Sequence, residues 1–123
     1  MQTAGKVVLD CAACLIAAGG FYDLCAPRLP SNLVAICGEN EAARNLAREL
    51  LRALGGCLIA IGLAVAVLAN GSPSRDDRAT LGLILLLVAP SEGINALSMK
   101  RCGSPFAVPL AFIAMTLIGV LLA

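Results

Sequence analysis

The side chains most capable of chemistry in this 123-residue sequence are its six cysteines. Cys11 and Cys14 have the Cys-x-x-Cys spacing of thiol–disulfide redox sites. Such an enzyme needs a second cysteine pair to pass electrons on. The other cysteines, at positions 25, 37, 57 and 102, are expected near the opposite side of a membrane. Because cysteines in apolar helices also act as small hydrophobic residues, we expect free thiols.

A second candidate site is a polar stripe inside the third apolar segment. Its members are Ser91, Glu92, Asn95 and Ser98. Their spacing places them on one face of a helix, and a carboxylate within the hydrocarbon region costs about 2.5 kcal/mol to insert. We therefore expect Glu92 to face protein and to be paired with a basic or hydrogen-bonding group, with Arg52 the first candidate and Arg48 the second. The stripe then either handles ions, protons or a polar headgroup, or serves as a structural ion pair.

Most enzyme classes lack their usual residues in this sequence. It contains no histidine, no tryptophan, and no P-loop, Gly-x-Gly-x-x-Gly or Gly-x-Ser-x-Gly motif. Four aromatic residues are too few for a cation-binding cage. A net charge of +1 gives no reason to expect nucleic acid as a partner. We therefore expect no catalytic, cofactor-binding or metal-binding residues, with lipid as the one small molecule that binds.

The composition is that of a membrane protein. Hydrophobic residues make up 59% of the chain and charged residues 14%, and the mean hydropathy is +0.90. Soluble domains have about 25% charged residues. Four spans of about 20 residues each fit within this length, with the rest left for connections. We expect residues 1–123 to form a single integral membrane domain.

Four apolar segments are the expected spans, at about 7–26, 50–69, 79–99 and 106–123. Pro27 and Pro30 end the first, because proline cannot donate a helical hydrogen bond. The preceding part of the second, 41–52, has apolar residues at helical spacing on one face and arginines largely on the other. Since no proline intervenes, we predict one helix over 41–69. The predicted fold is all-α, a four-transmembrane-helix bundle with an amphipathic extension before the second span.

The distribution of basic residues predicts the orientation. Six of the nine Lys and Arg residues lie on the side of the first and third connections, and three lie on the side of the termini. The positive-inside rule then places those connections in the cytoplasm, matrix or stroma. Both termini are expected on the opposite side of a bacterial inner membrane or an organellar (mitochondrial or plastid) membrane.

Small residues recur every four positions in the apolar segments. The residues expected to pack helices are Gly56, Ala60, Ala64, Gly62, Ala66, Ala89 and Gly93. Such positions let helix backbones approach closely within lipid. The second span has two small-residue faces, which is more than packing within one chain requires. This pattern predicts contacts with other membrane protein subunits as well as with lipids.

A longer pattern begins at Asn45 and reads Asn-x2-Arg-x3-Arg-Ala-Leu-Gly-Gly-x4-Ile-Gly-Leu. It resembles a family of small, functionally uncharacterised four-helix membrane proteins with an Arg-x-Leu-Gly-Gly entry to the second span. Arg78-Ala79 at the start of the third span and the Gly103-x-Pro105 turn are also similar to that family. The resemblance implies the same four-span topology and brings no catalytic residues with it.

Three functions are compatible with these features. The favoured hypothesis is a non-catalytic accessory or assembly subunit of a larger membrane complex, expected to be an energy-transducing one (respiratory or photosynthetic). The alternative is a small carrier or channel-like bundle that uses Glu92 and Asn95. A membrane thiol oxidoreductase that uses Cys11 and Cys14 is the third, and the sequence supports it least.

Overall fold

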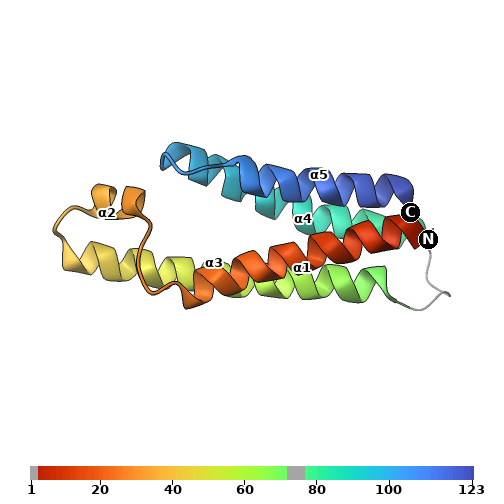
Figure 1. The fold of residues 1–123 in the computed structure, drawn as a ribbon, viewed down its shortest axis with the longest axis horizontal. Coiled ribbons are helices and arrows are strands. Elements are labelled where there is room, and N and C mark those ends of the chain that lie inside the picture. The colour runs from red at the N-terminus through yellow and green to blue at the C-terminus, as the bar shows by residue number, and fades with distance from the viewer. Residues whose placement is uncertain (1–2, 72–76) are drawn as a thin grey trace.

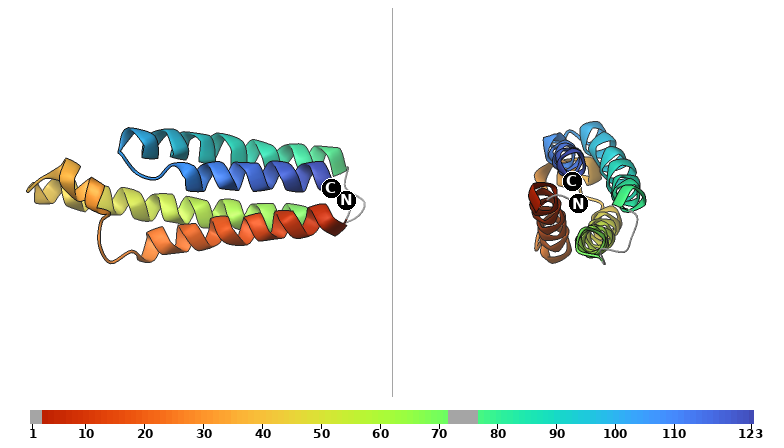
Figure 2. Two further views of the ribbon diagram at one scale, coloured as in Figure 1. Left: turned by 45° about the horizontal axis from the view of Figure 1, so that its top comes forward. Right: turned by 90° about the vertical axis from the view of Figure 1, so that its right-hand side faces the viewer.

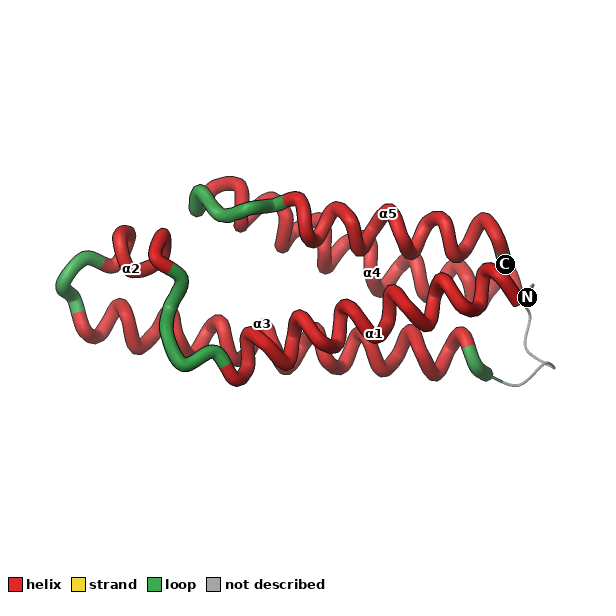
Figure 3. The backbone as a smooth tube through the Cα atoms, viewed as in Figure 1, coloured by secondary structure: helices red, strands yellow, loops and turns green. Residues whose placement is uncertain are grey.

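The computed structural model describes residues 3–71 and 77–123, which are entirely helical apart from their connections. The helices are α1 Thr3–Cys25, α2 Ser31–Cys37, α3 Glu41–Ala69, α4 Asp77–Arg101 and α5 Ala107–Leu122. Figure 3 shows helices and connections alone within the described ranges. The predicted all-α fold class is therefore confirmed.

The four longer helices lie side by side with their axes nearly aligned (Figures 1 and 2). Viewed from one end, α1 and α4 occupy diagonal corners, and each contacts both α3 and α5. The most extensive interface joins α1 and α3. Both ends of the chain lie together at one end of the molecule, while α2 and the beginning of α3 extend beyond the other end (Figure 1).

Helix α3 runs without a break from Glu41 to Ala69, so the predicted helix over 41–69 is confirmed. The Asn40 side chain caps it by accepting a hydrogen bond of 3.1 Å from the Ala43 backbone N–H. Gly55 and Gly56 do not interrupt it, because the surrounding Leu, Ala and Arg residues favour a helix strongly. Its 29 residues span about 43 Å at 1.5 Å per residue. This length exceeds the roughly 30 Å hydrocarbon core of a bilayer.

Three helical segments are long and apolar enough to cross a membrane: Thr3–Cys25, Glu41–Ala69 and Arg78–Arg101. The fourth predicted span corresponds to α5, which has 16 residues. At 1.5 Å per residue α5 reaches about 24 Å, which is shorter than the bilayer core. Three helices therefore support the assignment of the chain as a membrane protein.

Helix α2 was not predicted from the sequence. It occupies the first connection and has seven residues, too few for a clear apolar period. Gly38 ends it with a φ of 58°, a conformation that glycine adopts without the cost that a Cβ would impose. At its beginning, the Asn32 side chain donates hydrogen bonds to the Cys102 carbonyl (3.2 Å) and to Ser104 Oγ (2.5 Å). Asn32 thus ties α2 to the turn between α4 and α5.

One face of α3 packs against α1, and we call it the covered face. It consists of Gly55, Leu58, Gly62, Val65 and Ala69. Successive residues of this face are alternately three and four positions apart in the sequence. This period keeps one face of a helix against a neighbouring helix. The two backbones approach most closely where a methyl group added to Gly55 would lie 2.5 Å from the Gly20 carbonyl oxygen. A methyl group on Gly62 would lie 2.7 Å from the Ala13 carbonyl oxygen. Glycine is therefore required at both crossings.

Candidate functional site

Glu92 lies in the interior of the protein, as predicted. The residues that α4 turns inward follow one another at intervals of four: Thr80, Ile84, Val88, Glu92 and Ala96. Glu92 is 0% exposed, with apolar residues one turn away on either side. A carboxyl group thus occupies the place that the helix period would otherwise give to a hydrophobic residue.

The partner of Glu92 is a neutral amide on its own helix. The Asn95 side-chain nitrogen donates a hydrogen bond of 3.4 Å to Glu92 Oε2. Glu92 Oε1 is buried and has no hydrogen-bond partner among the described residues. The predicted pairing with a hydrogen-bonding group is therefore met weakly by Asn95, and the predicted ion pair with Arg52 is wrong.

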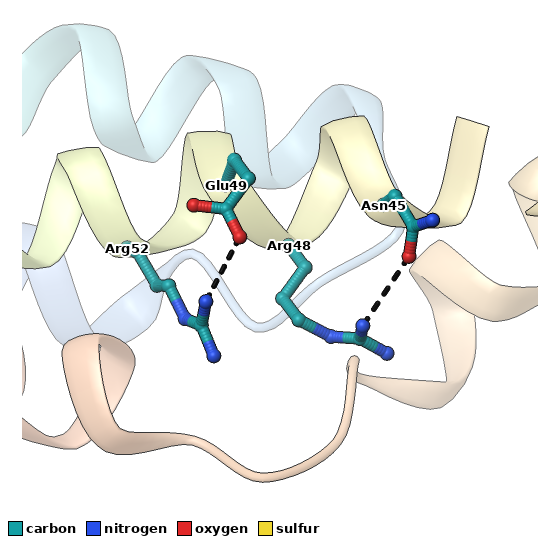
Figure 4. Close-up of polar contacts among 4 residues, drawn as sticks. All are labelled: Asn45, Arg48, Glu49 and Arg52. Atoms are coloured by element: carbon teal, nitrogen blue, oxygen red, sulfur yellow. Dashed lines mark hydrogen bonds and ion pairs between the residues drawn. The ribbon is translucent and has the colours of Figure 1, made fainter. Parts of the chain in front are cut away.

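Arg52 instead forms an ion pair of 2.8 Å with Glu49, one turn earlier on α3 (Figure 4). This contact is local, so it requires no other helix to be in place. Arg48 Nη1 donates a hydrogen bond of 3.3 Å to Asn45 Oδ1 on the same helix. In Figure 4 the side chains of Arg48 and Arg52 extend toward the connection between α1 and α2. Arg48 and Arg52 thus contact residues of their own helix, and the hydrogen-bond partner of Glu92 is Asn95.

The two serines of the predicted stripe stand apart from this pair. Ser91 is half-buried and donates a hydrogen bond of 3.3 Å to the Val88 carbonyl, which is local helical bonding. Ser98 is exposed. Of the four stripe residues, Glu92 is therefore fully buried, and Asn95 is half-buried beside it.

All six cysteines are free thiols, as expected. Cys11 and Cys14 are both exposed on α1. No group of three or more His, Cys, Asp or Glu side chains suited to a metal ion occurs within residues 3–71 and 77–123. No observation in these ranges favours the thiol oxidoreductase.

The arginines of α3 form a second polar cluster, which sequence reasoning missed as a site. A pocket of about 250 Å³ is lined by Glu41, Arg44, Asn45 and Arg48. The Nε atoms of Arg44 and Arg48 are buried without a hydrogen-bond partner in the described part of the chain. The i, i+3, i+4, i+7 spacing of these positions places them on one helix face. That spacing is the signal that could have revealed the cluster.

The predicted packing residues separate into two groups. Gly62 meets the backbone of α1, and Ala66 is half-buried against the core. Ala64 and Ala89 are also half-buried. In contrast, Ala60 is exposed, and a methyl group added to Gly56 or Gly93 would meet no described atom within 4 Å. Gly55, which sequence reasoning did not single out, forms the closest crossing with α1.

Asp10, about two turns inside α1, is joined to Asn70 at the end of α3. The Asn70 side-chain nitrogen donates a hydrogen bond of 2.6 Å to Asp10 Oδ1. It also donates to the Ala66 carbonyl at 2.9 Å. The place of Asp10 within the apolar helix α1 is therefore explained by a structural contact with the end of α3.

Comparison of the sequence with protein-family models found no match, and neither curated proteins nor solved structures gave one. The resemblance to small four-helix membrane proteins therefore stays a prediction.

Proposed function

We propose that this chain is a non-catalytic integral membrane subunit, with α5 as a fourth span, that assembles with another membrane protein through α3. The observation that carries this proposal is an uncovered side of α3, which we call the open face. It consists of Leu46, Leu50, Ala53, Gly56, Cys57, Ala60, Leu63 and Val67, all of them exposed. It lies opposite the covered face, so α1 and the open face contact different sides of the same helix.

The open face has the composition of a helix-packing surface. Its middle part contains only small residues, namely Ala53, Gly56, Cys57 and Ala60. The large residues stand at its two ends, with Leu46 62% and Val67 68% exposed. A second helix can approach closely at the small residues and contact the large ones above and below, which is how helices associate within lipid. The crossing of α1 and α3 at Gly20 and Gly55 uses the same arrangement.

The amphipathic extension supports this reading. Arg44 and Arg48 are half-buried against the protein, whereas Leu46 and Leu50 are 62% and 61% exposed. Leu46 and Leu50 thus face outward while Arg44 and Arg48 face the protein, although Glu41, Asn45, Glu49 and Arg52 of the same extension are also exposed. Lipid or a partner helix beside Leu46 and Leu50 accounts for the exposure of these two apolar side chains.

Crosslinking from Cys57 tests the proposal directly. Cys57 is a native thiol on the open face, and Cys14 is an equally exposed thiol on α1. Two variants, each retaining one of these cysteines, are labelled with a photoactivatable maleimide in the native membrane. We expect a crosslinked product of defined mass from Cys57 and none from Cys14. A chain that migrates as a monomer in mild detergent, with no product from Cys57, would contradict the proposal.

Bulky substitutions supply the matched control. Gly56→Ile fills the open face, whereas Gly82→Ile adds the same side chain on α4, where open space also surrounds the glycine. Gly82 stands beside exposed large residues, Leu83 and Leu86, so it offers no small surface to a partner. Loss of the Cys57 product in Gly56→Ile, with the product retained in Gly82→Ile, is the expected result.

A second candidate function, a small carrier or channel-like bundle, is favoured by Glu92. Its carboxyl group is fully buried, and Oε1 has no partner within the described ranges. Polar residues at such depth are costly and often mark ion or proton pathways. Proton and cation flux into liposomes, measured for the parent chain and for Glu92→Gln, tests this function. Glu49→Gln, which removes an exposed carboxylate, is the control. Flux that is absent from the parent, or equal in Glu92→Gln, removes this candidate.

A further inference from the structure

The basic residues of the α3 extension are neutralised unequally. Arg52 is paired with the Glu49 carboxylate at 2.8 Å. Arg48 contacts only the neutral Asn45 amide, at 3.3 Å. Arg44 forms no side-chain hydrogen bond or ion pair in the described part of the chain. Two guanidinium groups therefore stand one turn apart without an anionic partner, and Arg52, one turn further, has one.

These two guanidinium groups line the pocket of about 250 Å³ on the first turns of α3. The Nε atoms of both are inaccessible to solvent and have no acceptor among the described residues. Burying a charged donor without an acceptor is costly. An anion in the pocket would supply the missing acceptors. Glu41 also lines the pocket, so the lining carries two positive charges against one negative charge.

The chemistry of the lining specifies the anion. Guanidinium groups present forked donors that match the oxygens of a phosphate group. The pocket is smaller than the roughly 300–1,000 Å³ of sites for drug-sized ligands, so it suits a single headgroup. Leu46 and Leu50, on the same extension, are exposed and apolar. Basic pockets at the cytoplasmic or matrix edge of membrane helices are typical sites for anionic lipid headgroups.

We infer that the pocket formed by Glu41, Arg44, Asn45 and Arg48 binds a phosphate group. The group is carried by a phospholipid or by a soluble phosphate compound, and both sources present the same oxygens to the arginines. This inference does not depend on a protein partner on the open face, because the pocket lies on the other side of α3.

Affinity measurements on the full chain in non-ionic detergent test it. The probes are phosphatidylglycerol, inorganic phosphate and a glycosyl diacylglycerol that has no phosphate, with lipid binding followed by native mass spectrometry and phosphate binding by calorimetry. We expect the R44Q/R48Q variant to bind the phosphate probe about 100-fold more weakly, since each charge-assisted contact is worth about tenfold. Arg52→Gln is the matched control and should change affinity by less than about twofold, because its charge is already neutralised. Glu41→Gln should bind at least as tightly as the parent.

The probes distinguish the two sources. Arginine-dependent binding of phosphatidylglycerol alone assigns the site to a lipid headgroup, and arginine-dependent binding of inorganic phosphate alone assigns it to a soluble compound. If R44Q/R48Q fails to fold by circular dichroism, Arg48→Lys replaces it, because lysine keeps the charge and loses the fork. Binding of neither phosphate probe, equal binding of the glycosyl diacylglycerol, or an equal loss in Arg52→Gln would overturn the inference.

Discussion

The two faces of α3 are built from similar residues, but the covered face packs against α1 and the open face is exposed. The covered face carries Gly55 and Gly62, whose α-carbons lie against the backbone of α1. The open face carries Gly56 and Ala60, which no described residue covers. Both faces are apolar and interrupted by small residues, so composition alone does not distinguish them. A small-residue pattern therefore indicates that a helix face can pack closely against another helix, but it does not identify which helix.

The faces also differ beyond the end of α1. There, the side of α3 that continues the covered face bears Glu41, Arg44 and Arg48, while the open face continues with Leu46 and Leu50. The covered side changes from apolar to charged where α1 gives way to α2 and its preceding connection (Figure 4). On the open face, the exposed Glu49 lies between Leu46 and Leu50. One side of α3 therefore follows the chemistry of its intramolecular neighbours, and the other follows the chemistry of whatever surrounds the protein.

The sharpest test of the comparison is to add one methyl group to each face. Gly62→Ala places a Cβ within 2.9 Å of Ala17 backbone nitrogen and should lower the free energy of unfolding by about 2 kcal/mol, because the helices must separate. Gly56→Ala meets no described atom within 4 Å and should raise it by up to about 1 kcal/mol through helix propensity. Thermal unfolding in detergent measures both. Equal effects would mean that the two faces are equivalent in the isolated chain.

A double-mutant cycle between Glu92 and Arg52 tests whether the arginines of α3 act within their own helix. Glu92→Gln should raise the free energy of unfolding by about 1 kcal/mol, because a neutral amide is less costly at a fully buried site. Arg52→Gln should lower it by less than about 0.5 kcal/mol, since it breaks a surface pair. The two effects should add within about 0.5 kcal/mol. A larger coupling would indicate that Arg52 reaches Glu92 after all.

A third test concerns α2, which packs against α3. Asn32→Ala removes both hydrogen bonds between α2 and the turn after α4, which should release about 1 kcal/mol of local stability. The alkylation rates of Cys37 and Cys102, both half-buried, should then rise about fivefold. The rate of Cys14, already exposed, should stay constant. Unchanged rates at all three thiols would show that Asn32 does not hold α2 in place.

Local features were predictable because they depend on neighbours in the chain. The unbroken α3 follows from strong helix formers without a proline, and the inward position of Glu92 follows from the helix period of α4. The predicted partner of Arg52, Glu92, was wrong because the sequence offers Arg52 a second acid, Glu49. The competition was decided by Glu49, which is one turn away on the same helix and needs no tertiary contact. Helix α2 was missed because seven residues carry too little periodic signal.

The sequence by itself determined the four longer helices, the apolar character of the three that are long enough for a membrane, and the inward position of Glu92. Those properties depend on hydrogen bonding and side-chain transfer within each helix. Only the tertiary structure decided that Gly55 and Gly62, not Gly56 and Ala60, meet α1, and that Arg44 and Arg48 share a pocket. The physical reason is rotational. Successive residues are about 100° apart around a helix, so rotating α3 about its own axis would bring its other, similar face against α1, and only shape complementarity with α1 selects one of the two faces.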